Sequence, residues 1–439
     1  MKLLVPPLDI EIDDGFANDI DIFKRKSYGE ALLNLIKNTE DELVLALDAP
    51  WGEGKSTFIK MWQGLLLENN VSHIYFDAFE HDYHSDPFIS ISSHIYSLID
   101  QSDEDNHSEF KEKATSAIKL FGRAGLRIGI KALTAGLLDD SVLENTGNVK
   151  DASKEASDLV DGYISSQIGK ADEERETIAK FKKYLSNLAE SIGSDGKVIF
   201  IIDELDRCKP KYALALLESI KHLFSVPNIT FLLVTNREQL EESVRCEYGR
   251  EVKASEYLQK FVSIWTTLPK PNNAHASVPK LYLQNCLTRM EYTSSTRTQQ
   301  TTIEFFEYLA SYYNLSLRDI EKSLTNFAII NNAIGNLNTE YSLVSVFVAV
   351  TKTTRPDTYQ RLASNGITYK ELEVEASLSG LGTEYSGEGH PLKWLLKYLL
   401  ATDDEAEELL KQGNPFGGGV SGRNAIIDIC RWLESFRKN

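Results

Sequence analysis

The chain has 439 residues, of which 42% are hydrophobic and 26% charged, so it can bury a large core and does not have the composition of a disordered protein. Acidic residues outnumber basic ones by 65 to 47, and the net charge of −18 disfavours nucleic acid as a partner of the chain as a whole. The four cysteines lie far apart, without zinc-ligand spacing. With no signal-peptide pattern and no uncharged apolar stretch of about 18 residues, the sequence predicts a cytoplasmic protein.

The N-terminal hundred residues predict an arm followed by half of an α/β core. Residues 1–26 are expected to form an extended acidic N-terminal arm, and 27–38 have the apolar spacing of a helix. The run ELVLAL at 42–47 predicts a strand that leads into a glycine loop and a helix. A second strand is predicted at 72–79, so 27–100 is expected to hold the first half of the core.

The core pattern is then interrupted and resumes later. Polar helix-forming residues dominate 101–195, which predicts a helical insertion. Apolar strands return at 198–202 and 228–236, so 196–275 is expected to form the second half of the core. Strands that alternate with helices predict an α/β fold, with a parallel sheet, helices on both faces and ligand chemistry at the carboxyl ends of the strands. A helical C-terminal domain is predicted at 276–439.

A phosphate-binding loop is predicted between the first strand and its helix. The segment APWGEGKS matches the Walker A pattern GxxxxGK[ST] except that Ala49 replaces the first glycine. Gly52 and Gly54 let backbone N–H groups turn toward phosphate oxygens, where the helix N-terminus adds positive charge. We expect Lys55 to reach the β- and γ-phosphates and Ser56 to bind Mg²⁺. The residues expected to contact ATP in this loop are Pro50, Trp51, Gly52, Glu53, Gly54, Lys55, Ser56 and Thr57.

A second motif, of Walker B type, supplies two carboxylates. The apolar run VIFII ends in Asp203 and Glu204, which places both side chains at the ligand edge of the sheet. Asp203 is expected to hold Mg²⁺ through its water shell, and Glu204 to orient and deprotonate the attacking water. A strand that ends in two acids is common, but together with the lysine loop it predicts an enzyme that binds and hydrolyses Mg·ATP.

On these motifs the chain resembles the KAP family of P-loop NTPases. The resemblance spans roughly residues 27–330. It implies a P-loop NTPase fold with an insertion between the two motifs, ATP and Mg²⁺ as cofactors, and a link to phage exclusion. The family often has an aspartate where this chain has Glu204, a difference that favours hydrolysis. The residues that carry the resemblance are PWGEGKS (50–56), FDAF (76–79), DPF (86–88), DELDRCKP (203–210) and EYLQKFV (256–262).

Three further residues are candidates for phosphate contacts, each with a structural alternative. Arg207 would contact the γ-phosphate of this or a neighbouring subunit, or pair with Asp206. Asn236, at the end of a core strand, would bond the γ-phosphate or the attacking water, or cap the following helix. Arg318 resembles the arginine that helical lids of related NTPases direct at the phosphates, and its alternative is a solvated helix arginine.

The segment 114–138 within the insertion is apolar except for cations spaced four residues apart. That spacing keeps them on one stripe of a helix. The charges and glycines disfavour a membrane-spanning helix. A helix packed on this protein or a partner subunit is favoured over one that lies on an anionic membrane. The cations are Lys119, Arg123, Arg127 and Lys131.

Three functions are compatible with these patterns. The first is an enzyme that couples ATP hydrolysis to a rearrangement of the helical region or of an oligomer. The second is a nucleotide-gated binding protein with little turnover, which Glu204 disfavours. The third is a nucleic-acid-dependent ATPase, which the acidic balance disfavours. A homo-oligomer or a partner protein from the same system is expected.

Overall fold

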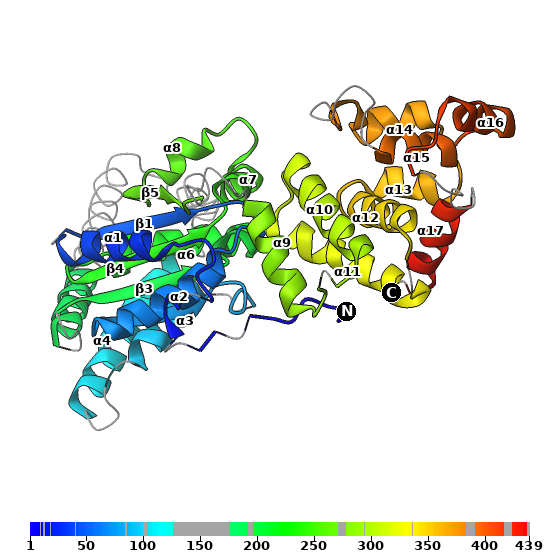
Figure 1. The fold of residues 1–439 in the computed structure, drawn as a ribbon. Helices are drawn as coiled ribbons and strands as arrows, with labels where there is room; N and C mark the ends of the chain where they lie inside the picture. Colours follow the sequence, from blue (N-terminus) through cyan, green and yellow to red (C-terminus); the bar gives the residue numbers. More distant parts are fainter. Residues whose placement is uncertain are drawn as a thin grey trace, which may run out of the picture.

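The computed structural model shows a sheet-containing part and a helical part that lie side by side (Figure 1). The structure describes the chain apart from residues 9, 12–13, 18, 40, 84–85, 98, 100–103, 126–174, 192–195, 271–277, 294, 336, 383–390, 417–423 and 437–439. Most of both parts is therefore described.

Within the described residues, five strands form one parallel sheet in the order β2-β3-β4-β1-β5. The parallel sheet predicted from the sequence is therefore confirmed. β4 lies between β1 and β3, so the two strands that carry the motifs are separated by one strand. The strands are Leu43–Asp48 (β1), Ser72–Asp77 (β2), Val198–Asp203 (β3), Ile229–Thr235 (β4) and Ile264–Thr267 (β5).

The central strands are apolar along nearly their whole length because both faces of the sheet are covered. In β1, Leu45 and Leu47 belong to the core on one face, and Val44 and Ala46 to the core on the other. β5 was not predicted. It is a short edge strand whose residues are exposed or half-buried, so it leaves no continuous apolar run in the sequence.

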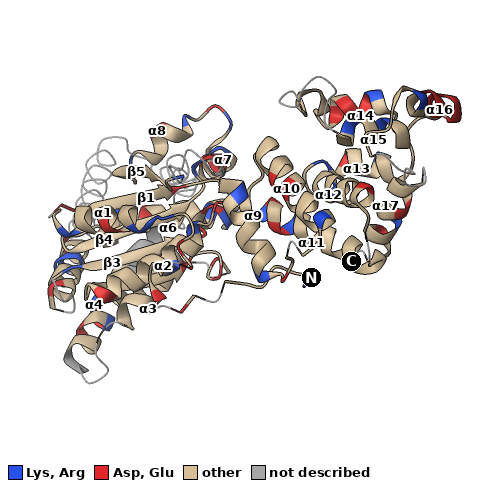
Figure 2. Cartoon of the chain, viewed as in Figure 1, with Lys and Arg blue, Asp and Glu red and all other residues tan. Residues whose placement is uncertain are grey.

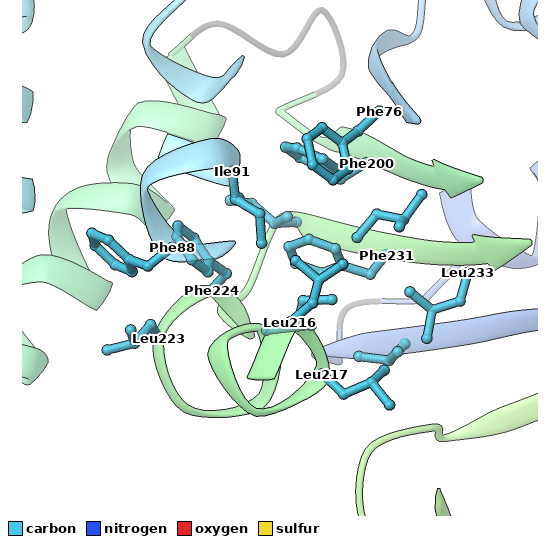
Figure 3. Close-up of a cluster of buried hydrophobic side chains, with 14 of the residues drawn as sticks. Phe76, Phe88, Ile91, Phe200, Leu216, Leu217, Leu223, Phe224, Phe231 and Leu233 are labelled. Carbon is cyan, nitrogen blue, oxygen red and sulfur yellow. The ribbon is translucent and has the colours of Figure 1, made fainter. Parts of the chain in front are cut away.

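Helices cover both faces of the sheet, as expected. On one face Ile36, Phe58 and Trp62 are fully buried. The opposite face buries Phe200 of β3 and Phe231 of β4 with their ring centroids 5.4 Å apart (Figure 3). The first face carries α1 (Lys26–Lys37) and α2 (Lys55–Glu68). The opposite face carries α3 (Pro87–Tyr96), α6 (Pro210–Ser219), the π-helical turn η4 (Ile220–Phe224), α7 (Arg237–Tyr248) and α8 (Ala254–Leu258).

Both described ends of the predicted insertion are helical and pack on the sheet-containing part. Phe110 of α4 (Glu104–Gly125) and Phe181 of the helix at 175–191 are buried in the same core. The segment 114–138 is helical as far as Gly125, and the rest of it lies outside the described residues. Along the described part of the chain, we find no helix with the length and apolar character needed to cross a membrane.

The C-terminal region is helical, as predicted, and has a core of its own. Phe306, Phe327 and Phe347 are fully buried in it. Acidic residues are frequent in α14 and α16 at the far end of this region (Figure 2). Its elements are α9 (Val278–Arg289), α10 (Arg297–Tyr312), α11 (Leu317–Ile334), α12 (Thr339–Thr354), α13 (Pro356–Ala363), α14 (Tyr369–Glu375), η5 (Leu378–Gly380), α15 (Pro391–Leu399), α16 (Asp403–Gln412) and α17 (Ala425–Ser435).

The N-terminal arm runs along both parts of the molecule. It starts against the helical region and leads to α1 of the sheet-containing part (Figure 1). The Lys2 N–H donates to the Met290 carbonyl at 2.8 Å, and the Asn332 side chain donates to the Met1 carbonyl at 3.1 Å. These bonds tie the first residues of the chain to the helical region.

Candidate functional site

The predicted phosphate-binding loop joins β1 to α2 at the carboxyl edge of the sheet. Gly52 and Gly54 have φ angles of +82° and +79°, a left-handed conformation that side chains disfavour. Gly54 is the N-cap of α2 and offers no side chain to bond the first N–H groups of that helix. The first turn of α2 therefore has the donors and the positive dipole end that attract an anion.

Ala49 fits the place of the missing first glycine because its backbone does not have positive φ. It is buried, and its N–H donates to the Thr235 carbonyl at 3.3 Å. The Lys55 ammonium donates to the Ala49 carbonyl at 2.5 Å and to the Pro50 carbonyl at 3.3 Å. Burial lowers the pKa of Lys55, and the nearby carboxylates, with Asp206 the strongest, oppose this shift.

Asp203 lies at the end of β3 and is almost fully buried. It accepts hydrogen bonds from the Glu204 N–H at 2.8 Å and from the Tyr75 hydroxyl at 3.1 Å. Burial raises the pKa of this carboxyl, whereas the nearby Ser56 side chain and the two hydrogen bonds lower it. The contact with Ser56 joins the two predicted motifs at one point.

Glu204 adopts a left-handed conformation with φ +60°, directly before the 3₁₀ turn η3 (Leu205–Arg207). Burial, followed by the charge of Asp203, raises the pKa of Glu204 to about 7, although the Arg207 guanidinium opposes the shift. Arg207 forms an ion pair with Glu204. The expected alternative, a pair between Arg207 and Asp206, is therefore wrong. In a 3₁₀ turn, side chains three residues apart lie on the same side, which brings 204 and 207 together.

Asp206 instead accepts a hydrogen bond from the indole N–H of Trp51. Trp51 belongs to the phosphate-binding loop and Asp206 to the turn after β3, so this bond links the two motifs a second time. The sequence motifs include both residues but do not indicate that they meet.

Asn236 caps α7, because its side-chain oxygen accepts the Glu238 N–H at 3.1 Å. This geometry is the structural alternative considered for Asn236. The next residue, Arg237, donates its N–H to Asp48 at the end of β1 with a distance of 2.8 Å. A contact between Asn236 and the γ-phosphate stays a prediction.

Arg318 lies in the first turn of α11, next to the phosphate-binding loop. The Leu317 N–H donates to the Gly52 carbonyl at 3.1 Å, and a Cβ on Gly52 would lie 3.0 Å from the Cβ of Arg318. The helical region thus packs directly on the loop. Arg318 therefore lines the cavity beside the loop. A contact between Arg318 and a phosphate stays a prediction.

A cavity of about 200 Å³ adjoins the loop and brings together residues from five parts of the chain: the arm, the loop with α2, the turn after β3, α9 and α11. All the loop residues from Pro50 to Thr57 line it, together with Glu204, Arg207 and Arg318. Most of the remaining lining residues were not predicted from the sequence, because they come from the arm and α9, where no motif or periodicity marks them. The missed residues include Leu8, Asp21, Ile22, Phe23, Arg25 and Tyr282.

The oxygen atoms at the junction of the two motifs suit a magnesium ion. Ser56 offers a hydroxyl and Asp203 a carboxylate, and they are already in contact. Mg²⁺ prefers such hard oxygen ligands, and protein sites commonly provide only one or two of them and leave the other positions to water and phosphate. The donor set therefore fits Mg²⁺ that arrives together with a nucleotide.

The sheet order, the glycine loop before α2 and the acidic end of β3 define a P-loop NTPase. A model described as the KAP family P-loop domain matches residues 25–334, and the chain belongs to this family. Among solved structures, the chain is similar to the Aeropyrum pernix ORC2 protein in its ADPNP-ADP complexes, with 14% identity, 94% of each chain covered and a TM-score of 0.35. No curated protein matches the chain.

Proposed function

We propose that the chain binds Mg·ATP in the loop around Lys55 and hydrolyses it with Glu204 as the general base. The observation that carries the proposal is the contact of Ser56 with Asp203, with Glu204 next to it and Lys55 in the same loop. This arrangement provides a phosphate cradle, a pair of magnesium ligands and a base at one edge of the sheet. It is the minimum set for attack of water on a γ-phosphate.

Each residue has a separate role in this proposal. The Lys55 ammonium leaves the Ala49 carbonyl and binds the β- and γ-phosphates, which are stronger acceptors because they are charged. Ser56 and Asp203 hold Mg²⁺, which neutralises developing phosphate charge when it is bound. Glu204 accepts a proton from the attacking water.

Arg207 keeps the Glu204 carboxylate engaged before nucleotide binds. We propose that the γ-phosphate attracts the guanidinium away from Glu204, so that Arg207 contacts phosphate and Glu204 becomes free to act on water. Asn236 and Arg318 complete the phosphate contacts in the proposal, Asn236 from the end of β4 and Arg318 from α11.

The runner-up function is a nucleotide-gated switch with little turnover, which the Glu204–Arg207 ion pair favours because it occupies the base. Multiple-turnover phosphate release from purified protein separates the two. Repeated release supports the enzyme, and release of about one phosphate per site supports the switch. The same assay with DNA or RNA tests the nucleic-acid-dependent alternative, for which strong stimulation is the required result.

The biological role is proposed from the family alone. We propose an ATPase component of an anti-phage defence system, acting in the cytoplasm as a homo-oligomer or with a partner protein. Plaque counts on cells that express the wild-type chain or its Lys55→Ala variant test this role. Equal plaque counts with and without the wild-type chain, over a panel of phages, would contradict it.

A further inference from the structure

The side chain of Tyr75 in β2 reaches the acidic end of β3, although neither predicted motif includes this residue. We propose that Tyr75 is a positioning residue, whose hydroxyl holds the Asp203 carboxylate in the orientation needed to bind Mg²⁺. This inference rests on the proposed binding of Mg·ATP at this edge of the sheet. Tyr75 is not itself a magnesium ligand in the proposal, because it acts only through Asp203.

The strand register explains how the two side chains meet. β2 and β3 pair in parallel, and Asp203 lies two positions beyond the residue opposite Tyr75, so the two are diagonal neighbours on one face of the sheet. Ile74 and Phe76 are buried in the core on the opposite face, which is why Tyr75 points the other way. The face that Tyr75 shares with Asp203 is covered by α2, whose first turn holds Ser56. A long aromatic side chain can span this diagonal, whereas a short one could not.

The Asp203 carboxylate is held at both of its oxygens. Oδ2 accepts the Tyr75 hydroxyl at 3.1 Å, and Oδ1 accepts the Glu204 N–H at 2.8 Å. One such bond leaves a carboxylate free to rotate about Cβ–Cγ, whereas two bonds from different strands fix its plane. Any residue at 204 other than proline supplies the N–H, so the hydroxyl is the half of this pair that a substitution at 75 removes. Asp203 is 1% exposed, so water is poorly placed to replace that donor.

The orientation of Asp203 matters because Mg²⁺ is exacting and the site is crowded with negative charge. Mg²⁺ demands near-ideal octahedral geometry, so a ligand that turns away is lost. The carboxylate of Asp77 lies beside that of Asp203 in the strand register, and the two charges repel. Asp77 is held in its own turn, where it accepts the Glu80 N–H at 3.0 Å. Without the Tyr75 bond, this repulsion would turn the Asp203 carboxylate out of its place.

A tyrosine suits this role because its hydroxyl is neutral. A lysine or arginine at position 75 would form an ion pair with Asp203 and compete with the metal, whereas a phenol fixes the carboxylate and leaves its charge available. Residues that bond a metal ligand, and not the metal, commonly change metal affinity by about 10- to 100-fold when they are mutated. We expect an effect of that size from Tyr75.

The test compares Tyr75→Phe with Tyr96→Phe in the full-length chain. Phenylalanine keeps the ring of Tyr75 and removes only the hydroxyl that bonds Asp203. Tyr96 in α3 is the matched control, because Tyr75 and Tyr96 are 37% and 38% exposed and the Tyr96 ring packs on His107 and Phe110 of α4. Calorimetry gives the affinity for ADPNP, a non-hydrolysable ATP analogue, in Mg²⁺ and in EDTA. Single-turnover hydrolysis of ATP is followed at increasing Mg²⁺ concentrations.

We expect Tyr75→Phe to bind ADPNP in Mg²⁺ about 10- to 100-fold more weakly than the wild type. In EDTA its affinity should equal that of the wild type, because the phosphate loop does not depend on this hydroxyl. Its slowed hydrolysis should recover as the Mg²⁺ concentration rises, since excess metal compensates for a weakened ligand. Tyr96→Phe should match the wild type in all three measurements.

Three results would overturn the inference. ADPNP affinity in Mg²⁺ that survives Tyr75→Phe shows that Asp203 needs no support from the hydroxyl. Equal losses in Mg²⁺ and in EDTA mean that Tyr75 supports the fold or the loop, and not the magnesium ligand. Slowed hydrolysis that added Mg²⁺ does not restore leads to the same conclusion. If the wild type binds ADPNP no more tightly in Mg²⁺ than in EDTA, or does not bind it, the proposed function itself is wrong.

Discussion

Apart from the proposed magnesium ligands, Trp51 is the residue that links the two motifs most directly. Its indole N–H donates to Asp206, and Arg207 next to Asp206 pairs with Glu204. The turn that carries the proposed base is therefore held to the phosphate loop by one tryptophan side chain. A change in the loop on nucleotide binding would reach Glu204 through this bond.

We predict that Trp51→Phe, which keeps an aromatic ring but removes the N–H donor, slows hydrolysis in a single turnover. The lost bond to a charged acceptor at a partly exposed site should also cost about 1 kcal/mol in the free energy of unfolding. Trp432→Phe in α17 is the control, because that side chain is 40% exposed and Trp51 is 43% exposed. Equal hydrolysis rates in the two variants would contradict the proposed role of the Trp51 N–H in hydrolysis.

Which residues of the site could be predicted from the sequence depended on local sequence patterns. Lys55 and Ser56 could be found because strand, glycine loop and helix are contiguous in the chain, and Asp203 and Glu204 because they end a buried strand. The choice of partner for Arg207 could not be predicted. Both Glu204 and Asp206 are near it in sequence, and only the 3₁₀ turn decides between them.

Among the secondary-structure elements, α11 matters most for the site because its N-terminus packs on the loop. The first-turn N–H of Leu317 bonds the Gly52 carbonyl, and Ser316 caps the helix in a capping box with Asp319. The contact is close because Gly52 has no side chain. Movement of the loop and movement of α11 are therefore coupled.

Alanine substitutions of two glycines test this contact: Gly52, which packs against the N-terminus of α11, and Gly335, which is the C-cap residue of the same helix. Gly52 and Gly335 have φ angles of +82° and +85°, so alanine at either position should cost about 1 kcal/mol of backbone strain. Only at Gly52 does the new Cβ meet a neighbour, the Arg318 Cβ at 3.0 Å, whereas nothing lies within 4 Å at Gly335. We expect both variants to lose thermal stability and only Gly52→Ala to lose ATP affinity. Equal ATP affinities in the two variants would contradict the proposed coupling.

The elements themselves were largely predictable, because the central strands are continuous apolar runs and the helices of the C-terminal region have regular apolar spacing. The contacts of the N-terminal arm were not. They join residues far apart in the chain, such as Arg25 with Pro269 or Lys2 with Met290, and no local pattern encodes such pairs. The wall of the cavity that the arm provides was missed for the same reason.

On the scale of the whole molecule, the proposed nucleotide site lies where the two parts meet. The arm and α11 are two separate links from the site to the helical region, and both begin next to the loop around Gly52 and Glu53. Binding of a nucleotide at the loop is therefore expected to change the exchange of amide hydrogens in both parts. Hydrogen exchange measures this directly, peptide by peptide.

We predict that Mg·ATP slows exchange in the arm at 19–25 and in the first turn of α11. Lys55→Ala should abolish nucleotide binding and this protection together, because it removes the ammonium that faces the β- and γ-phosphates. Lys60→Ala on the exposed side of α2 is the control and should retain both. Protection confined to the loop, with no change in the arm or in α11, would contradict the coupling of the two parts.

The measurement that tests the central claim most directly is single-turnover hydrolysis by the Glu204→Gln variant. Glutamine keeps the volume of the side chain but removes the base, and leaves Lys55, Ser56 and Asp203 to hold Mg·ATP. We predict that this variant binds ATP but hydrolyses it about 10²–10⁴-fold more slowly. The companion variant Asp203→Ala should bind more weakly as well, because it loses a proposed magnesium ligand. A chemical step in Glu204→Gln as fast as in the wild type would contradict the assignment of Glu204 as the base.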